Sequence, residues 1–449
     1  MSIKKPEARV LENKYFKLKG GFMSKIAVIG GCGRLGLKLS LILANKGHQV
    51  TAIDLDEERI TELKGGNLPF VETGAEIFLE EALKNRTLKL SLENDLVTLA
   101  DVIIITIGTP VDSNLNPTLE PIAGVIFDIA DYIKEKQLII FRNTLSPTIA
   151  KRLKTLIEDK TRFKVGKEIF LAFAPEISNE TNINNLLNAP QPIGTYDEKS
   201  FEAAKKFFET VTKGKITNLT PEEVLLAKLM NNMSSYVQSA VANEFYLVAE
   251  SYGANIHKIL EATNSELRTQ PPKAAQLFSP NLNVSGPGTH KEGWFLVDRL
   301  PFAELITTAF KINESMVNHM IRKLEGHKIN KVGILGMTNK PNSDDTSSSL
   351  SYKLRKALYY KDYEVGCYDP FLPEYSDSLS LRNSDVIILM TPHNEFKDFE
   401  KIQSLVNNPN CIYIDIGGFW KETREQGRNG IWQHKEEKVK EKSREKRKK

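Results

Sequence analysis

The sequence predicts an α/β protein with two parallel-sheet domains and a helical domain between them. Short apolar runs alternate with amphipathic stretches in the first part of the chain, and a second such series begins near residue 331. One long helical pattern, from Thr220 to Gly253, separates the two series. A length of 449 residues is enough for two to three domains.

Both ends of the chain are strongly basic, whereas the body between them is mildly acidic. Residues 1–22 hold six Lys or Arg and two Glu, and residues 433–449 hold nine Lys or Arg and four Glu. We expect both ends to be disordered extensions, with Met23 as an alternative start; an electrostatic tether to acidic partners is the alternative function. This distribution disfavours nucleic-acid binding, for which a basic body is expected.

Hydropathy and cysteine usage narrow the class of protein. No apolar run reaches the roughly 18 residues that a membrane span needs, and the N-terminus lacks the apolar region of a signal peptide. The three cysteines, Cys32, Cys367 and Cys411, are too far apart for disulfide or metal-site spacing. We therefore expect a cytoplasmic protein with no metal site and no membrane insertion.

The first element is a β-rich run at residues 25–30, which leads into a glycine-rich turn and then a helical pattern to Asn45. A second strand ends at Asp54, about 18 positions after the last glycine of the turn. Glycines in such a turn permit close approach of a pyrophosphate to a helix N-terminus, and the acidic residue can accept from a ribose hydroxyl. The predicted cofactor-binding residues of the turn are Gly31, Gly33, Arg34, Leu35 and Gly36.

This pattern predicts a Rossmann-type dinucleotide-binding domain, and a purely structural turn is the alternative. Asp54 favours NAD over NADP, because its charge would repel a 2′-phosphate. Further strands are predicted at 101–108, 137–143 and 168–175. Polar residues follow these strands, namely Thr109, Thr144 and Glu176. Ligands of open α/β sheets bind at the carboxyl ends of strands, so we expect these residues to line the crevice.

The long helix has a well-marked start and end. Thr220 and Glu223 have the spacing of a capping box, Pro221 suits the first turn, and Gly253 can end the helix. At 1.5 Å per residue the helix is roughly 45–50 Å long, which suggests a spine that joins two lobes. Lys228 and Asn232 lie four apart and so on one face. Lys228 either extends outward to water or belongs to a site.

A Pro-, Asn- and Gly-rich stretch from Ser265 to Gly293 is predicted to be a binding loop, since it is too long for a simple connector. A second series of strands follows, at residues 331–337, 363–369, 385–391 and 411–417. Cys367 and Cys411 fall within these apolar runs, where a cysteine is more often a small core residue than a reactive thiol.

The chain resembles the UDP-glucose/GDP-mannose (nucleotide-sugar) dehydrogenase family over nearly all of residues 24–420. The resemblance is carried, in the family's order, by GCGRLG, IGTPVD, NTLSPT, PEISNE, AKLMNNMSSYVQSAVANE, SGPG, the VD pair at Asp298, LGMTNKPNSDD and YDP. It implies an NAD domain, a central domain that supports a homodimer, and a C-terminal domain that binds the nucleotide of the sugar. The predicted divisions are 1–22 (extension), 23–215 (NAD-binding), 216–325 (central helical), 326–432 (nucleotide-sugar-binding) and 433–449 (basic tail).

The resemblance also implies roles for individual residues. Lys228 and Asn232 match the lysine and asparagine that stabilise alkoxide and oxyanion species, and Lys228 is therefore expected in the site. Asp298 matches the family's aspartate, and Thr144 its threonine near the reacting water. The remaining matches are Glu176 and Glu180 of the Pro-Glu segment, Gly288 of the SGPG turn, and Lys340, with Glu180 assigned to catalysis and the other three to the substrate.

The chain departs from the family at three places. The family's nucleophilic cysteine lies between its Gly-Pro-Gly turn and its aspartate, but the segment from Gly286 to Asp298 has none and is one residue longer. Gly293 or Trp294 takes its place. An arginine is replaced by Ser347, and the closing Gly417-Gly418 motif lacks its basic residue. His290 and Glu292 are candidate substitutes, although a histidine on such a loop is more often a solvated residue.

Three functions follow from these residues. The first is an NAD-dependent oxidoreductase that acts on a CH–OH group of a nucleotide sugar, for polysaccharide precursor synthesis, and does not complete the usual two-step oxidation. The SGPG turn and the VD pair are more similar to family members that use UDP-N-acetylhexosamines. The second is a non-catalytic nucleotide-sugar-binding homologue or regulatory partner. The third, a single-step dehydrogenase of the β-hydroxyacid type, is disfavoured by the second α/β lobe.

Overall fold

The computed structural model describes residues 23–109, 118–177, 187–267, 277–284, 289–297, 300, 303–420 and 431–433. The predicted basic extensions, apart from Gln433, therefore lie outside the described residues. The chain forms two compact units, Met1–Met230 and Asn231–Lys449, and the division falls within one long helix. The finer domain divisions predicted from the sequence stay a prediction.

The N-terminal unit is built on an eight-stranded sheet with the order β3-β2-β1-β4-β5-β6-β7-β8. The strands are β1 (Lys25–Ile29), β2 (Gln49–Ile53), β3 (Leu88–Ser91), β4 (Val102–Ile105), β5 (Leu138–Phe141), β6 (Phe170–Phe173), β7 (Gln191–Thr195) and β8 (Ile216–Leu219). The first six are parallel, and β7 pairs antiparallel to β6. The strand order reverses beside β1, which is where open α/β sheets bind dinucleotides.

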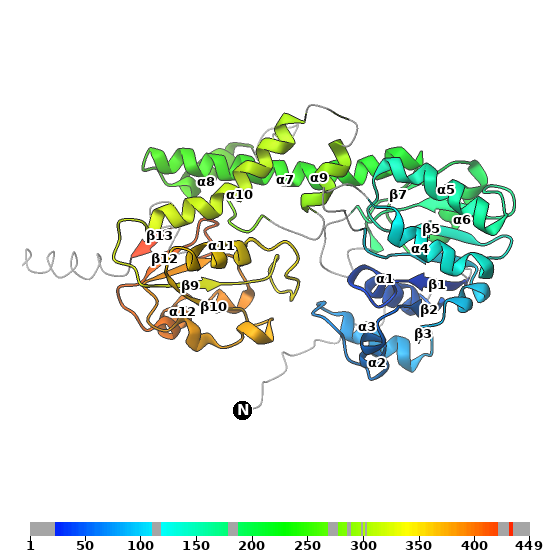
Figure 1. Ribbon diagram of the computed structural model, residues 1–449, viewed down its shortest axis with the longest axis horizontal. Coiled ribbons are helices and arrows are strands. Elements are labelled where there is room, and N and C mark those ends of the chain that lie inside the picture. The colour runs from blue at the N-terminus through cyan, green and yellow to red at the C-terminus, as the bar shows by residue number, and fades with distance from the viewer. Residues whose placement is uncertain are drawn as a thin grey trace, which may run out of the picture. The chain divides into compact units, whose positions relative to one another are not determined.

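Helices lie on both faces of this sheet, as Figure 1 shows. They are α1 (Arg34–Asn45), α2 (Glu57–Lys64), α3 (Ala75–Lys84), α4 (Glu120–Ile129), α5 (Pro147–Thr161) and α6 (Glu198–Phe208), with short 3-10 turns η1 (Asn94–Leu99) and η2 (Ala130–Tyr132). Each face of the sheet has its own hydrophobic core, and successive side chains of β1 point alternately into one core and the other. Ile26 and Val28 pack with α1, α3 and α6, whereas Ala27 and Ile29 pack with α4 and α5. The predicted doubly wound sheet is confirmed.

The predicted long helix is confirmed as α7 (Pro221–Ser251). Its capping box is formed in both directions: the Thr220 N–H donates to Glu223 Oε2 at 2.8 Å, and the Glu223 N–H donates to Thr220 Oγ1 at 3.2 Å. Gly253, two residues beyond the end of the helix, has φ of +65°, a conformation that favours glycine.

The C-terminal unit contains a second sheet with the order β10-β9-β11-β12-β13. Its strands are β9 (Lys331–Leu335), β10 (Glu364–Tyr368), β11 (Val386–Leu389), β12 (Ile412–Ile414) and β13 (Ile431–Gln433). The four predicted strands are confirmed and pair in parallel. A fifth strand, β13, was not predicted from the sequence; it pairs antiparallel to β12.

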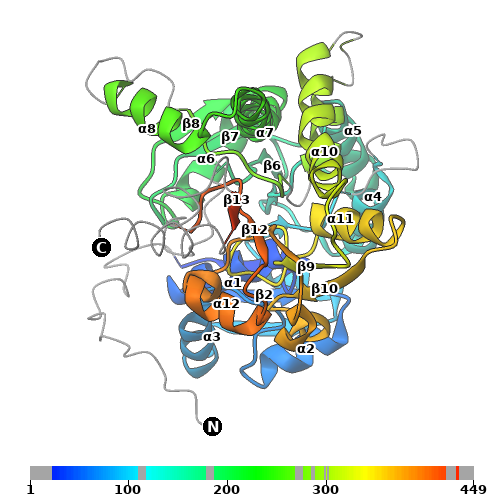
Figure 2. The ribbon, with the colours of Figure 1, turned by 90° about the vertical axis from the view of Figure 1, so that its left-hand side faces the viewer.

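Helices of the C-terminal unit are α8 (Ile256–Leu267), α9 (Thr289–Val297), α10 (Glu304–Leu324), α11 (Leu350–Tyr359) and α12 (Phe399–Val406), with 3-10 turns η4 (Pro373–Tyr375), η5 (Ser378–Leu381) and η6 (Asn394–Phe396). In Figure 2, α11 and α12 lie on opposite faces of the sheet, which matches the two separate cores that they share with its strands. The predicted loop from Ser265 to Gly293 was wrong at both ends, because α8 continues to Leu267 and α9 begins at Thr289. No helix of the described ranges is long and apolar enough to cross a membrane.

Candidate active site

The glycine-rich turn between β1 and α1 is packed so tightly that two of its positions exclude a side chain. A Cβ at Gly31 would lie 2.7 Å from Cβ of Ala52 on β2. A Cβ at Gly36 would lie 2.0 Å from the carbonyl oxygen of Gly30 and 2.7 Å from Thr106 Oγ1. The glycines at these positions thus permit the tight turn and the close packing of α1 on the strands that a dinucleotide-binding turn requires, so the turn fits a dinucleotide.

Asp54 follows β2 and connects that strand to the turn. Its Oδ2 accepts from the Cys32 N–H at 2.9 Å, and its Oδ1 accepts from the Asp56 N–H at 3.3 Å. Each carboxylate oxygen has a second lone pair, which leaves acceptor capacity for ribose hydroxyls. The guanidinium of Arg34 stacks on the Phe70 ring at 4.7 Å, and Leu35 is half-buried in the first turn of α1.

The other predicted residues of this unit lie at the same edge of the sheet. Thr109 follows β4 and is 6% exposed, whereas Thr144 after β5 and Glu176 after β6 are half-buried. Behind them Arg142 is buried and donates to the Ala174 carbonyl at 2.8 Å and to Gln191 Oε1 at 2.5 Å. Burial lowers the pKa of Arg142, and the charge of Glu176 opposes that shift. Arg142 falls within a predicted strand, and its support of the segment before Glu176 was not predicted from the sequence.

On α7, Lys228 and Asn232 lie one turn apart, as predicted. Lys228 is 8% exposed, so the alternative in which its ammonium extends to water is wrong. Asn232 is half-buried, and its Nδ2 donates to Glu292 Oε2 on α9 at 2.5 Å. Glu292 is itself only 4% exposed. This contact joins Asn232, an expected site residue, to Glu292, a candidate substitute for the missing cysteine.

Gly293, one of the two positions at which the family's cysteine could fall, has no room for a side chain. A Cβ there would lie 2.7 Å from Cε2 of Phe310 and 3.2 Å from Sδ of Met233. The Phe310 ring is held between Trp294, stacked at 6.3 Å, and Tyr236, at 4.7 Å. The missing thiol is thus accompanied by a packed aromatic cluster.

The three cysteines present in the chain are buried and cannot replace it. Burial is the main cause that raises the pKa of Cys32 to about 12, of Cys367 to about 11 and of Cys411 to about 12. All three are therefore neutral thiols at neutral pH, and the prediction that Cys367 and Cys411 are core residues is confirmed. In the described part of the chain, no cluster of His, Cys, Asp and Glu could hold a metal ion.

In the C-terminal unit, Lys340 lies half-buried on the loop after β9. Asp369 organises this loop, because its Oδ2 accepts from the N–H groups of Met337 at 2.7 Å and Thr338 at 3.1 Å. His393 Nε2 lies 3.0 Å from the same oxygen, and its Nδ1 accepts from the Asn342 N–H at 2.9 Å. The remaining predicted site residues, Asp298, Glu180 and Gly288, lie outside the described residues, as does the side chain of His290.

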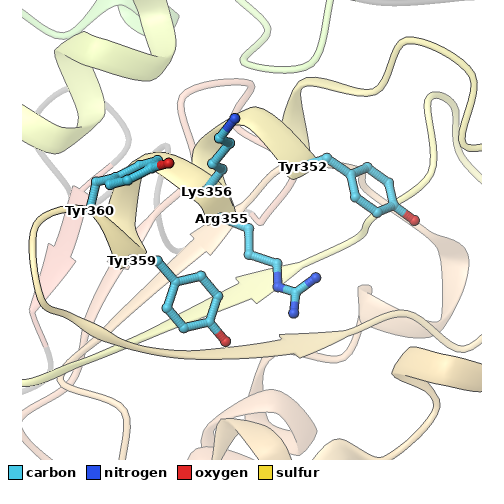
Figure 3. A pocket seen from close by; sticks show the side chains of 5 residues that line it. All are labelled: Tyr352, Arg355, Lys356, Tyr359 and Tyr360. Atoms are coloured by element: carbon cyan, nitrogen blue, oxygen red, sulfur yellow. The ribbon is translucent and has the colours of Figure 1, made fainter.

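A separate hollow of about 400 Å³ lies on the outer side of α11, and no predicted site residue lines it (Figure 3). Its lining residues are Tyr352, Arg355, Lys356, Tyr359 and Tyr360. Arg355 donates to the Tyr375 hydroxyl at 2.9 Å and stacks on Tyr359 at 5.5 Å. These cations and rings satisfy one another, so the cluster holds α11 against the segment after β10.

A dinucleotide-binding sheet, a long helix with a buried lysine and an asparagine, and a second α/β sheet together define a nucleotide-dependent dehydrogenase. The chain matches three domains of the UDP-glucose/GDP-mannose dehydrogenase family. They are the NAD binding domain at residues 24–212, the central domain at 222–315 and the UDP binding domain at 333–422. The chain belongs to the UDP-glucose/GDP-mannose dehydrogenase family. The prediction of the family, of NAD as cofactor and of a nucleotide-sugar dehydrogenase is confirmed.

Individual relatives agree with this assignment. A UDP-N-acetyl-D-mannosamine dehydrogenase from Methanocaldococcus jannaschii is 31% identical over 396 residues, which cover 85% of this chain and 89% of that protein. A solved UDP-D-ManNAc dehydrogenase from Pyrococcus horikoshii is 27% identical with a TM-score of 0.81, covering 90% and 100% of the two chains. The UDP-N-acetyl-mannosamine dehydrogenase Cap5O from Staphylococcus aureus is 26% identical with a TM-score of 0.73, covering 84% and 90%.

Proposed function

We propose that this protein oxidises a UDP-N-acetylhexosamine, with UDP-N-acetyl-D-mannosamine as the first candidate, at a CH–OH group for polysaccharide precursor synthesis. The match to the UDP binding domain and the names of the relatives support this substrate class. When bound, NAD supplies the hydride acceptor. The fingerprint turn and Asp54 would bind it, with Thr109 and Thr144 at the same sheet edge.

Residues of the chain would divide the remaining chemistry as follows. Lys228 and Asn232 stabilise the negative charge that develops on the reacting oxygen. Asp298, which matches the family's aspartate, is assigned to the same catalytic group. Thr144 and Glu180 assist the reacting water, while Glu176, Gly288 and Lys340 bind the substrate. These roles are carried over from the family motifs.

We further propose that the reaction stops after one oxidation. The second oxidation of this family proceeds through an adduct between the aldehyde and a thiolate. The proposal rests on one observation: no cysteine is present between Gly286 and Asp298. The product is then an aldehyde with one NADH per sugar, and the reverse reaction is a reduction.

The stoichiometry of NADH formation tests this proposal. UDP-N-acetyl-D-mannosamine is incubated with excess NAD, NADH is counted by absorbance, and the product is identified by mass spectrometry. One NADH per sugar and an aldehyde are expected. Two NADH and a uronic acid would contradict the single-step proposal.

The second candidate is a non-catalytic nucleotide-sugar-binding homologue. One observation favours it: the Asn232 amide is engaged by the Glu292 carboxylate, whose charge would repel a developing oxyanion. Binding of the sugar, seen as a raised melting temperature, with no NADH formed from any UDP- or GDP-sugar would establish this candidate in place of the first.

We also propose that the protein acts as a homodimer through α7 and α8. An apolar hollow of about 360 Å³ lies against these helices. Its rim includes large exposed side chains: Phe245 is 42% exposed, Val248 50%, Tyr252 84% and Ile259 42%. A second copy of the chain would remove this apolar surface from water.

A further inference from the structure

Glu292 is a nearly buried carboxylate in the C-terminal unit, on the segment where the family carries its cysteine. It is 4% exposed, and its Oε2 accepts from Asn232 Nδ2 at 2.5 Å. The adjacent Lys291 has its pKa lowered by burial, and the charge of Glu292 opposes that shift. Met233 and Phe310 pack around the next residue, Gly293.

This position creates an electrostatic conflict if Asn232 stabilises an alkoxide. Two negative charges that share one amide donor repel each other, and the repulsion is strong where little water screens it. The conflict disappears if the proton of the substrate hydroxyl passes to the carboxylate, because neither oxygen then carries a full charge in the product. The same amide contact fixes the direction in which the carboxylate faces.

We infer that Glu292 is the general base of the alcohol oxidation, an inference that rests on the proposed function. The O–H bond of the substrate breaks and its proton passes to a Glu292 oxygen. The electron pair of that bond forms the C=O bond, while the C–H bond breaks and its hydride passes to NAD. The products are the aldehyde, NADH and a carboxylic acid, which returns its proton to water. In the reverse reduction the same acid protonates the reacting oxygen.

The decisive variant is Glu292→Gln, which keeps an oxygen that can accept from Asn232 but cannot take a proton. Glu244→Gln is the matched control, because Glu244 is an exposed glutamate on α7. General acid–base groups contribute roughly 10²–10⁴-fold to rate, so kcat should fall at least about 100-fold in Glu292→Gln and stay unchanged in Glu244→Gln. The acid limb of the kcat/KM pH profile should disappear only in the former.

A second variant distinguishes proton transfer from a structural role. Glu292→Ala leaves space beside Asn232, and added formate should restore turnover in a concentration-dependent way, which it does not do for the wild type or for Glu244→Gln. Glu292→Gln with wild-type or faster turnover, or no rescue by formate, overturns the inference and leaves the proposed function intact. Absence of NADH formation by the wild-type protein overturns both.

Discussion

His319 Nε2 lies 2.6 Å from Glu250 Oε2, and this contact joins α10 to α7 inside the C-terminal unit. Lys323 of α10 donates to the other oxygen of the same carboxylate, and the Tyr246 hydroxyl donates to it at 3.1 Å. Burial works against the charge of Glu250, but the hydrogen bonds from His319 and Lys323 outweigh it. They lower the pKa of Glu250 from 4.5 to about 2.

A lowered carboxyl pKa predicts acid-dependent stability. The contribution is fully present above pH 4.5, the ordinary value, and is lost as the pH falls toward about 2. It amounts to roughly 2–3 kcal/mol of unfolding free energy. Glu250→Gln should therefore melt several degrees below the wild type at pH 7, and the gap should narrow between pH 4.5 and pH 3. Glu244→Gln should show no gap, and a gap that widens on acidification would contradict the assignment.

Replacement of Asp54 should narrow the preference for NAD over NADP. Calorimetric titration of the wild type should show tighter NAD binding, because the carboxylate accepts from ribose hydroxyls and repels a 2′-phosphate. Asp54→Ala should weaken NAD binding by about 10–100-fold, the size of a hydrogen bond to a charged group. Asp54→Asn is the matched variant, since it retains an acceptor for the Cys32 N–H. Tighter NADP binding by the wild type would remove the ribose assignment.

Replacement of Lys228 should reduce turnover more than substrate affinity. An ammonium directed at developing oxyanion charge acts mainly in the transition state, and loss of one such donor reduces kcat by about 10²–10³-fold. Steady-state kinetics of Lys228→Ala should show this fall with a small change in KM. Lys228→Met keeps the apolar stem and separates loss of charge from loss of packing. A raised KM with unchanged kcat would instead identify Lys228 as a binding residue.

Sequence patterns predicted the elements whose determinants are local. The capping box of Thr220 and Glu223 and the apolar strands of both sheets need only neighbouring residues, and they were located within a few positions. Three strands of the first sheet, β3, β7 and β8, were not predicted. Of these, β8 is a partly exposed strand with a polar residue at Asn218. β13 was missed because it comprises three residues that pair with β12 across an intervening stretch of chain.

In the candidate site, too, features set by neighbouring residues were predicted, whereas contacts between distant residues were not. The fingerprint and Asp54 are adjacent in sequence, so their spacing was informative. The contact between Asn232 and Glu292 joins residues that are 60 positions apart, and neither its existence nor the burial of Glu292 could be read from either segment alone. The helical state of Thr289–Val297 was hidden by the preceding glycines and proline, which are typical of a loop.

The proposed dimer predicts that a charge on the exposed apolar face of α7 separates the subunits. Tyr252→Asp should shift the mass measured by light scattering from that of two chains to that of one, because a carboxylate would lose hydration in the interface. Tyr360→Asp is the matched control, since Tyr360 directly follows α11 and is 78% exposed, close to the 84% of Tyr252. A wild-type protein with the mass of one chain would refute the dimer.

The packing at Gly293, one of the two positions where the family's cysteine could fall, opposes the return of a thiol at that position. A lone Gly293→Cys change would force the Phe310 ring away from Trp294 and Tyr236, so its first effect would be a less stable protein. A smaller residue at Phe310 would have to come first, and that change alone brings no gain in chemistry while it opens a cavity. At Gly293 a thiol would therefore need a paired change at Phe310, whereas Trp294, the other position where the cysteine could fall, is 41% exposed and is not restricted in this way.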